Sequence, residues 1–367
     1  MEIAPALISG TTGNRAYWRR SKNNAMKLTE LRNQLGRPAR GVQTYAARTL
    51  RRVACCQEIP EIYDRLEPSD DPQLRLSQIV DGRFLVREIF GRDEVATIYR
   101  AVDLLQRKRE VALKVPLLSV ENDPVSFARF LREEQIGLGL AHPLLQKYFP
   151  VAGEKCRPYI AMEFLRGCTL AHLAQEMGPL SEADAFKIVR LLCDALGYMH
   201  AQNLVHCDLK PANILLCCDH TLRVMNFGFA SRPTHERNGP GQTVSFSRTP
   251  QYLAPEQVEH GPIDARTDIY GLGVILHELL TVGAPFQDEG GGSRGPQRTV
   301  EQANAPQASN SALSAKAEEI VRRALQCKPE DRYPSMAAFK AELSTPPQTA
   351  PGGFDEPLQP QRWPESA

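Results

Sequence analysis

The sequence has no run of about 18 consecutive apolar residues, although 42% of its 367 residues are hydrophobic. Because a helix needs roughly that length to cross a bilayer, we expect no membrane span. An excess of charge of either sign is also lacking, since 44 basic and 43 acidic side chains leave a net charge of +1. No apolar stretch follows an initial charge cluster, so the start is not typical of a secretory signal peptide. These absences favour a soluble chain without a membrane span.

Metal-ligand spacing is missing as well. The nine cysteines include no CxxC pair, and neither Cys55-Cys56 nor Cys217-Cys218 has the spacing of zinc ligands. Free thiols are typical of a reducing compartment. We therefore expect a cytoplasmic chain without a zinc site.

The segment 204–216, LVHCDLKPANILL, carries the most chemical information in the chain. Phosphoryl transfer depends on positioning the nucleophile and on neutralising charge around the phosphates. Asp208 can accept the proton of an attacking hydroxyl, Lys210 can reach the transferred phosphate, and Asn213 can offer an amide oxygen to Mg²⁺. The segment resembles the HRDLKPxN catalytic loop of protein kinases, in the form found in the serine/threonine branch.

Other motifs of that family follow in order over residues 83–343. Val111 to Lys114 (VALK) is similar to the VAIK strand, whose lysine would clamp the α and β phosphates of ATP. A helical pattern over 127–140 is similar to the kinase C-helix and contains Glu133. We expect a Lys114–Glu133 ion pair, with the adjacent Glu134 as the alternative partner.

Two glycines weaken this helix, because each costs about 1 kcal/mol of helix stability relative to alanine. Gly137 stands four residues after Glu133, where the family packs a hydrophobic side chain against the phenylalanine that corresponds to Phe227. With Gly139 close behind, the sequence predicts a loosely held C-helix to which inactive positions are accessible.

Later motifs resemble structural parts of the same family. The segment TPQYLAPE is similar to GTPxYxAPE, in which Thr249 would bridge the catalytic aspartate and lysine. Glu256 in this segment is expected to pair with Arg332, which matches the late arginine of the family. Asp268 resembles the buried aspartate that anchors the catalytic-loop backbone.

The resemblance also implies the residues of a nucleotide site. Met162 would be the gatekeeper, and Glu163 to Leu165 the hinge that bonds adenine. The implied ATP-binding residues are Gly91, Ile98, Ala112, Lys114, Glu133, Met162, Glu163, Leu165 and Leu215. The implied cofactors are ATP and Mg²⁺, with Mn²⁺ as an alternative metal.

The glycine loop departs from the family pattern GxGxxGxV, because the segment 91–98 keeps only its first glycine, Gly91. Bare backbone there lets amide groups approach the phosphates. Asp93 and Glu94 put negative charge near a triphosphate, and Ala96 adds a methyl group. The sequence therefore predicts weaker nucleotide binding.

A second departure is Asn226, which stands before Phe227 and Gly228 where the family has a metal-binding aspartate. A neutral amide holds Mg²⁺ less tightly than a carboxylate. The expected metal ligands are then two amides, Asn213 and Asn226. A loss of about 4 kcal/mol in the transition state would slow turnover roughly a thousandfold. Phe227 and Gly228 are expected to be structural or regulatory.

Cys207 replaces the arginine that grips a phosphate on the activation segment of many kinases. Hydroxyl side chains are present between Asn226 and Glu256, so this segment can be phosphorylated. The usual receptor for such a phosphate is missing.

The expected fold is α+β, a two-lobed protein kinase fold with a small antiparallel β lobe carrying the C-helix and a larger, mainly helical lobe. We expect a kinase domain over 79–344, with lobes at about 83–163 and 164–344 and a flexible Gly/Pro/Gln-rich insert at about 287–307. The tail 345–367 is Pro-rich and expected to be disordered. One helix is expected from Ser181 to about Ala201, opened by a capping box between Ser181 and Asp184. Another helix is expected over Ile269 to Leu280.

Residues 1–78 form a basic extension, partly helical or disordered, in which basic side chains outnumber acidic ones. A flexible or docking extension is favoured over a nucleic-acid domain, because aromatics beyond Trp18 and Tyr45 are few, and the partner of this extension stays open. Translation could also begin at Met26.

Three functions are weighed. The first is an ATP- and Mg²⁺-dependent serine/threonine protein kinase of the eukaryotic-like type found in bacteria. The second is a pseudokinase that binds nucleotide or acts as a scaffold, favoured by Asn226, Asp93 and Ala96. The third is a small-molecule phosphotransferase, against which the Ala254-Pro255-Glu256 motif argues.

Overall fold

A computed structural model describes residues 74–234, 250–281, 310 and 313–344. The chain divides into two compact units. Unit 1 comprises the chain up to Met177 together with Ala212–Gly228, and unit 2 comprises Gly178–Pro211 and the chain from Phe229 onward. The predicted insert and tail, and the predicted extension before residue 74, lie outside the described residues.

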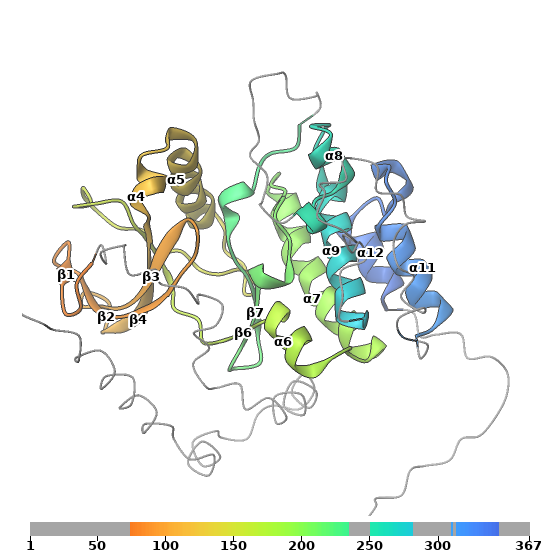
Figure 1. The fold of residues 1–367 in the computed structure, drawn as a ribbon, viewed down its shortest axis with the longest axis horizontal. Helices are drawn as coiled ribbons and strands as arrows, with labels where there is room; N and C mark the ends of the chain where they lie inside the picture. Colours follow the sequence, from red (N-terminus) through yellow and green to blue (C-terminus); the bar gives the residue numbers. More distant parts are fainter. Residues whose placement is uncertain (1–73, 235–249, 282–309, 311–312, 345–367) are drawn as a thin grey trace, which may run out of the picture. The chain divides into compact units, whose positions relative to one another are not determined.

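Unit 1 contains a five-stranded antiparallel sheet, of which strands β1 to β4 are labelled in Figure 1. The strand order is β1-β2-β3-β4-β5. Its strands are β1 (Ile79–Val80), β2 (Phe84–Arg92), β3 (Ala96–Asp103), β4 (Arg109–Pro116) and β5 (Ile160–Glu163). Side chains alternate between the faces of a strand, so Val111, Leu113 and Val115 of β4 enter one hydrophobic core. Ala112 and Lys114 therefore lie on the opposite face.

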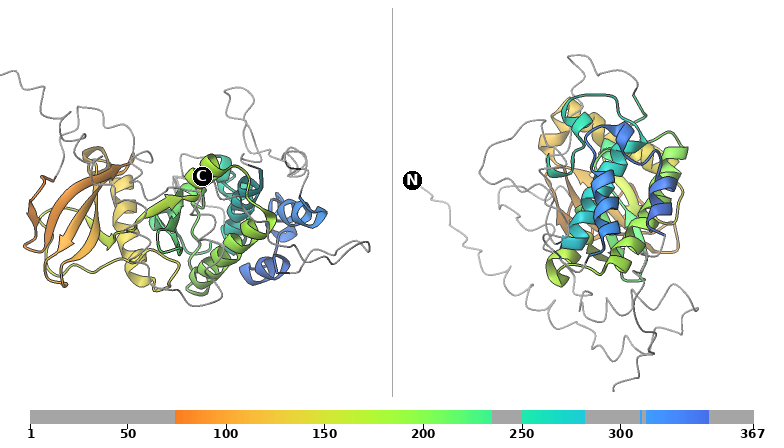
Figure 2. Two further views of the ribbon diagram at one scale, coloured as in Figure 1. Left: turned by 90° about the horizontal axis from the view of Figure 1, so that it is seen from below. Right: turned by 90° about the vertical axis from the view of Figure 1, so that its right-hand side faces the viewer.

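Two helices follow β4 in unit 1, α4 (Leu118–Glu121) and α5 (Pro124–Gly139). Asp123 caps α5 by accepting a hydrogen bond from the Ser126 amide at 3.0 Å, and Pro124 occupies the first turn. This cap starts the helix three residues before the predicted 127. Figure 2 (left) shows α5 running beside the sheet.

A second, three-stranded antiparallel sheet in unit 1 has the order β6-β7-β8. Its elements are β6 (Gly167–Thr169), β7 (Ile214–Cys217) and β8 (Leu222–Val224), with helix α6 (Leu170–Met177) directly after β6. A Cβ atom on Gly167 would lie 2.1 Å from the carbonyl oxygen of Leu216. Only glycine therefore allows β6 to approach β7 this closely.

Unit 2 is mainly helical in its described part (Figure 1). Its helices are α7 (Glu182–Ala201), α8 (Pro255–Val258), α9 (Ala265–Thr281), α11 (Ala315–Ala324) and α12 (Met336–Glu342). Helix α9 is buried on all sides, as expected of a central helix. A Cβ on Gly273 would lie 2.7 Å from that of Ala324, so this glycine lets α11 pack closely.

Helix α7 begins after Ser181 and ends at Ala201, as predicted, but its cap differs from the expected capping box. The Ser181 side chain accepts no backbone hydrogen bond and instead donates to the carboxylate of Asp184. Burial raises the pKa of Asp184. The hydroxyl thus satisfies a buried acid rather than the helix terminus.

The predicted fold class is confirmed, because an antiparallel sheet with one long helix is combined with a mainly helical part. Helix α9 contains the predicted helix 269–280, and β4 and β5 contain most of the predicted strands. Among the helices of the described ranges, none has both the length and the apolarity needed to cross a bilayer.

Candidate functional site

One face of the unit 1 sheet gathers most of the predicted nucleotide-binding residues. Ile98 of β3 is the register partner of both Gly91 in β2 and Lys114 in β4. On the other side of β4, Ala112 pairs with Met162 of β5. Directly opposed residues share a face of a sheet. The other four residues therefore share one face of the sheet with the buried Lys114.

The predicted ion pair is present on this face. Lys114 Nζ lies 2.9 Å from Oε1 and 2.7 Å from Oε2 of Glu133, and both residues are 4% exposed. A buried pair with two charge-assisted hydrogen bonds fixes α5 against the sheet. The alternative, Glu134, is bonded to Lys155 at 2.5 Å instead.

Two asparagines lie next to this pair in unit 1. Asn226 has a left-handed backbone (φ 65°), which asparagine tolerates well. Its Nδ2 donates to Oδ1 of Asn213 at 2.7 Å, and its Oδ1 accepts from Lys114 Nζ at 3.4 Å. An ammonium group can only donate, so the amide oxygen of Asn226 faces the lysine and its NH₂ faces Asn213.

This arrangement does not fit a divalent cation held by both amides. Mg²⁺ requires oxygen ligands. In the observed orientation, the NH₂ group of Asn226 faces the oxygen of Asn213, where a cation would need an oxygen ligand. If the amide were rotated by half a turn, its NH₂ group would face the ammonium of Lys114, and the two donors would oppose each other. A carboxylate at position 226 would present oxygen to both neighbours. The described residues contain no cluster of three or more His, Cys, Asp or Glu side chains that could hold a metal ion.

The turn between β2 and β3 replaces the glycine loop. Oδ1 of Asp93 accepts hydrogen bonds from the backbone amides of Val95 at 2.8 Å and Ala96 at 2.6 Å. These are the amides that a bare loop would leave for phosphate oxygens. The carboxylate thus closes the turn on itself through two hydrogen bonds, which the sequence did not indicate.

The predicted hinge is also in unit 1. The carbonyl of Glu163 accepts from Nε2 of Gln146 at 3.1 Å, and its carboxylate lies 3.5 Å from Nε of Arg223. Leu165 is half-buried in the connection between β5 and β6, and Leu215 is buried in β7. A carbonyl has two lone pairs, so Glu163 retains one for a ligand.

The predicted proton acceptor and phosphate-facing lysine both lie in unit 2. Asp208 is 6% exposed, and its Oδ2 is 3.5 Å from Nζ of Lys210. The backbone amide of Asp208 donates to Nδ1 of His206 at 3.3 Å. Such a carboxylate can accept a proton from a hydroxyl that enters this loop.

Asp268 anchors the backbone of this loop. Its oxygens accept from the amides of His206 at 2.9 Å and Cys207 at 3.0 Å, and Oδ2 lies 2.7 Å from Nε2 of His200. Burial alone would raise the pKa of Asp268, but the hydrogen bond and charge of His200 and the His206 contacts hold it below its ordinary value. The loop therefore rests on an ionised group of α9.

Cys207 is buried where the family has an arginine. Its backbone is left-handed (φ 63°), its carbonyl accepts from Nε2 of Gln257 at 2.8 Å, and its side chain packs with Val205 and Ile263. Burial and the neighbouring Asp268 raise the pKa of the thiol. An apolar cluster thus occupies the place of a phosphate receptor.

The predicted Glu256–Arg332 pair is present in unit 2. NH1 and NH2 of Arg332 each lie 2.8 Å from one oxygen of Glu256, and Thr267 also donates to this carboxylate at 2.8 Å. Three backbone carbonyls accept the remaining hydrogen bonds of the guanidinium, those of Gln326, Cys327 and Arg266.

Phe227 is fully buried in unit 1, and a Cβ on Gly228 would lie 3.3 Å from Oε2 of Glu133. Thr249 and the hydroxyl residues 243–247 lie outside the described residues. Sequence reasoning did not single out Tyr148, which donates to Glu133, or Gln257 and His200, which support the catalytic loop. For Tyr148 a signal existed, since the glycine at 137 leaves space for a large neighbour.

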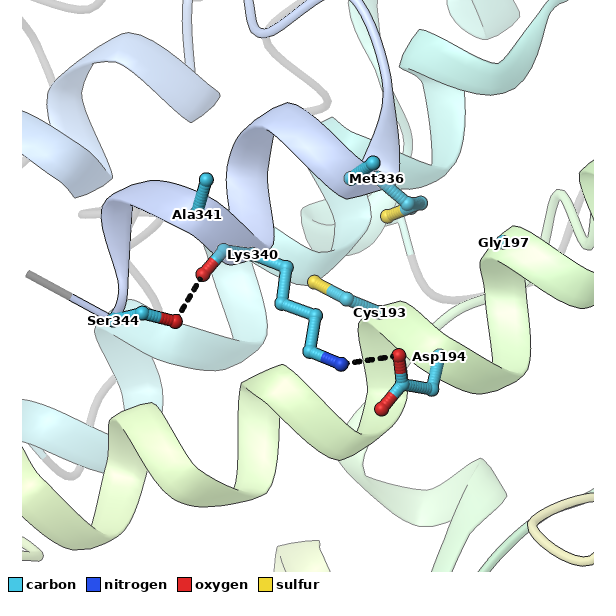
Figure 3. Close-up of a pocket in the computed structure, with 8 residues that line it drawn as sticks. Cys193, Asp194, Gly197, Met336, Lys340, Ala341 and Ser344 are labelled. Carbon is cyan, nitrogen blue, oxygen red and sulfur yellow. Dashed lines mark hydrogen bonds and ion pairs between the residues drawn. The ribbon is translucent and has the colours of Figure 1, made fainter.

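A cavity of about 520 Å³ lies between α7 and α12 of unit 2 (Figure 3). Cys193 and Met336 line it, and an ion pair of 2.5 Å between Lys340 and Asp194 borders it. No residue of the predicted site lines this cavity.

Comparisons with known proteins agree with the resemblance. The family described as "Protein kinase domain" matches residues 84–343. The chain is similar to the serine/threonine-protein kinase PknB of Mycobacterium tuberculosis, 34% identical over 268 residues, which cover 72% of this chain and 43% of the relative. For PknB of Mycolicibacterium smegmatis the identity is 32% over 270 residues, with 72% and 43% covered. A probable serine/threonine-protein kinase of Streptomyces coelicolor is 32% identical, with 71% and 39% covered. The chain thus spans less than half the length of these relatives.

Proposed function

Because the chain belongs to the protein kinase family, we propose that it transfers the γ-phosphate of ATP to serine and threonine hydroxyls of proteins, with impaired metal binding. The family uses ATP and a divalent metal ion, and the similar proteins are named serine/threonine-protein kinases. The observation that carries the proposal is the buried Lys114–Glu133 pair on the sheet face that holds Ile98, Ala112 and Met162.

In this proposal Lys114 binds the α and β phosphates, and Asp208 accepts the proton of the attacking hydroxyl. Lys210 neutralises charge on the transferred phosphate. The hinge at Glu163 to Leu165 bonds adenine. Glu256, Asp268 and Arg332 have structural roles, and Thr249 and the Phe227-Gly228 pair have structural or regulatory ones. The kinase domain extends over 79–344, between the basic extension and the tail.

The chain's described cysteines are all free thiols, which supports a reducing, cytoplasmic compartment. The partner is a protein substrate or binding partner rather than nucleic acid. Support for a protein substrate comes from the Glu256–Arg332 pair, which holds the segment resembling the peptide-binding motif.

The alternative is a nucleotide-binding or scaffolding module without physiological phosphotransfer. Two observations favour it. The amide of Asn226 donates to Asn213, so the two residues satisfy each other rather than a cation. Asp93 already occupies the amides of Val95 and Ala96.

Phosphate transfer from labelled ATP separates the two functions. The wild type is assayed on itself and on a generic basic protein, with Mg²⁺ and with Mn²⁺. We expect weak transfer in the wild type and a rise of up to roughly a thousandfold in Asn226→Asp, since a restored carboxylate recovers about 4 kcal/mol of transition-state stabilisation. Asp208→Ala should abolish transfer in both backgrounds.

The matched control is Asn226→Asp combined with Asp208→Ala, which keeps the new carboxylate and removes the proton acceptor. An inert wild type beside an active Asn226→Asp would refute the kinase proposal and leave the binding module. If the wild type is active and Asp208→Ala is not, the alternative function as a binding module without phosphotransfer is ruled out. Stabilisation of the wild type by ATP in thermal unfolding tests nucleotide binding separately.

Variants of Asp93, in the turn that replaces the glycine loop, test separately whether this turn limits ATP binding. Asp93→Asn keeps the turn geometry with a neutral acceptor, and Asp93→Gly releases the two amides altogether. If the carboxylate competes with phosphate, Asp93→Gly binds ATP more tightly than the wild type. Equal affinities would show that the turn does not limit binding.

A further inference from the structure

Tyr148 lies beside the Lys114–Glu133 pair but belongs to neither of its elements. It follows α5 in the chain and forms an isolated antiparallel bridge with Met162 of β5. Its hydroxyl donates to Oε1 of Glu133 at 3.0 Å, and the residue is 4% exposed. Glu133 thus accepts hydrogen bonds from two different segments. Lys114 of β4 donates two of them, and Tyr148 donates the third.

The ring of Tyr148 fills the space that Gly137 leaves on α5. A Cβ atom on Gly137 would lie 2.4 Å from Cγ and 2.5 Å from Cδ1 of the ring. The ring centroid is 5.6 Å from that of Phe227, which is fully buried. The sequence predicts a loosely held helix because Gly137 has no side chain, and the structure supplies the missing contact from outside the helix.

The phenol is suited to this position because it remains a neutral donor. Burial, followed by the charge of Glu133, raises its pKa well above the ordinary value. A neutral hydroxyl satisfies Oε1 without competing for the charge of Lys114.

We propose that Tyr148 is a positioning residue that holds Glu133 on Lys114, with its hydroxyl on the carboxylate and its ring interlocked with Gly137. The helix α5 is then held inward by a residue outside it. The effect on ATP rests on the proposed function, whereas the effect on α5 does not.

The test uses the full chain and the variant Tyr148→Phe, which keeps the ring and removes the hydroxyl. Amide hydrogen exchange is followed over residues 124–139 without nucleotide, and ATP affinity is measured by titration. We expect exchange in this segment to be about tenfold faster and the ATP Kd to rise by about three- to tenfold, as for the loss of one hydrogen bond to a charged group.

Tyr159→Phe is the matched control. It removes another phenol–carboxylate hydrogen bond of unit 1, from the buried Tyr159 to Oδ2 of the exposed Asp81 at 2.5 Å. This control should leave both exchange over 124–139 and ATP affinity unchanged. Equal effects in the two variants, or no effect of Tyr148→Phe on the exchange, would overturn the proposal. A wild type that binds no ATP would defeat the proposed function, and the exchange would still decide the role of Tyr148.

A second pair of variants tests the interlock itself. Gly137→Ala should displace the ring and speed exchange over 124–139, although alanine favours helix. Tyr148→Leu removes the clash, so the double variant should exchange more slowly than Gly137→Ala alone. If Gly137→Ala slows exchange in the wild-type background, the ring does not fill the space beside Gly137 and the interlock is refuted.

Discussion

Two buried ion pairs, one in each unit, differ in what surrounds them. The guanidinium of Arg332 is bound by Glu256 and by three backbone carbonyls. The ammonium of Lys114 is bound by side chains from different segments, those of Glu133 and Asn226. Both pairs are buried, and both were predicted from motifs.

The difference separates a structural pair from one that can exchange partners. Backbone carbonyls cannot rotate away, so Arg332 is fixed by the fold itself, with no need of a ligand. The partners of Lys114 are an amide and a carboxylate on side chains, which a phosphate can displace or join. Burial of a charge therefore does not by itself distinguish the two pairs, whereas the kind of their partners does.

The largest effect is expected for Arg332→Met. Removing one member of a buried pair leaves Glu256 charged without its partner and should cost about 3–5 kcal/mol of unfolding free energy. Denaturant unfolding measures it. Lys340→Met is the control. The side chains of Lys340 and Asp194, which form an ion pair, are 34% and 44% exposed. An exposed pair of this kind should contribute at most about 0.5 kcal/mol to the free energy of unfolding. Similar losses in the two variants would contradict the comparison.

A smaller loss of stability, about 2 kcal/mol, is expected for Lys114→Met. Tyr148 continues to donate to Glu133, so part of the buried charge remains satisfied. The functional effect should be the larger one, with loss of the stabilisation that ATP gives to the wild type in thermal unfolding. If Lys114→Met destabilises as strongly as Arg332→Met, the distinction between the two pairs fails.

The smallest effect, about 1–2 kcal/mol at neutral pH, is expected for Asp268→Asn. The pKa of Asp268 is lower in the folded chain than in the unfolded chain, so the folded state binds fewer protons in acid. Its contribution is complete above the ordinary aspartate pKa, about 3.9. It is lost as the pH falls through the lower folded value.

The stability difference between wild type and Asp268→Asn should therefore be constant from neutral pH down to about pH 5 and narrow below about pH 4. Urea unfolding at several pH values measures it. A difference that grows in acid would show that Asp268 is not ionised against His200 and the loop amides.

Much of this fold could be predicted because its parts are local motifs. The strand that ends near Lys114 and the helix that contains Glu133 each have their own periodicity, and the spacing between them fixes the pair. Glu256 and Arg332 were found in the same way. Choosing Glu133 over Glu134 needed the family pattern, since only the packing of α5 shows that Glu134 turns to Lys155.

Other parts could not be predicted because they depend on contacts between segments that carry no motif. The direction of the Asn226 amide is set by Lys114, a residue far away in the sequence. Asp93 was expected to put negative charge near the phosphates, but the sequence did not indicate that its carboxylate also caps its own turn. Ser181 has the sequence of a capping box, yet its hydroxyl donates to the buried carboxylate of Asp184 instead.

The fit of Tyr148 against Gly137 makes these two positions depend on each other. Glycine at 137 without a large residue at 148 would leave space unfilled beside α5. With the ring in its present position, a methyl group at 137 would lie 2.4 Å from ring atom Cγ, so the ring would have to move. A substitution at either position therefore changes which side chains the other position accommodates.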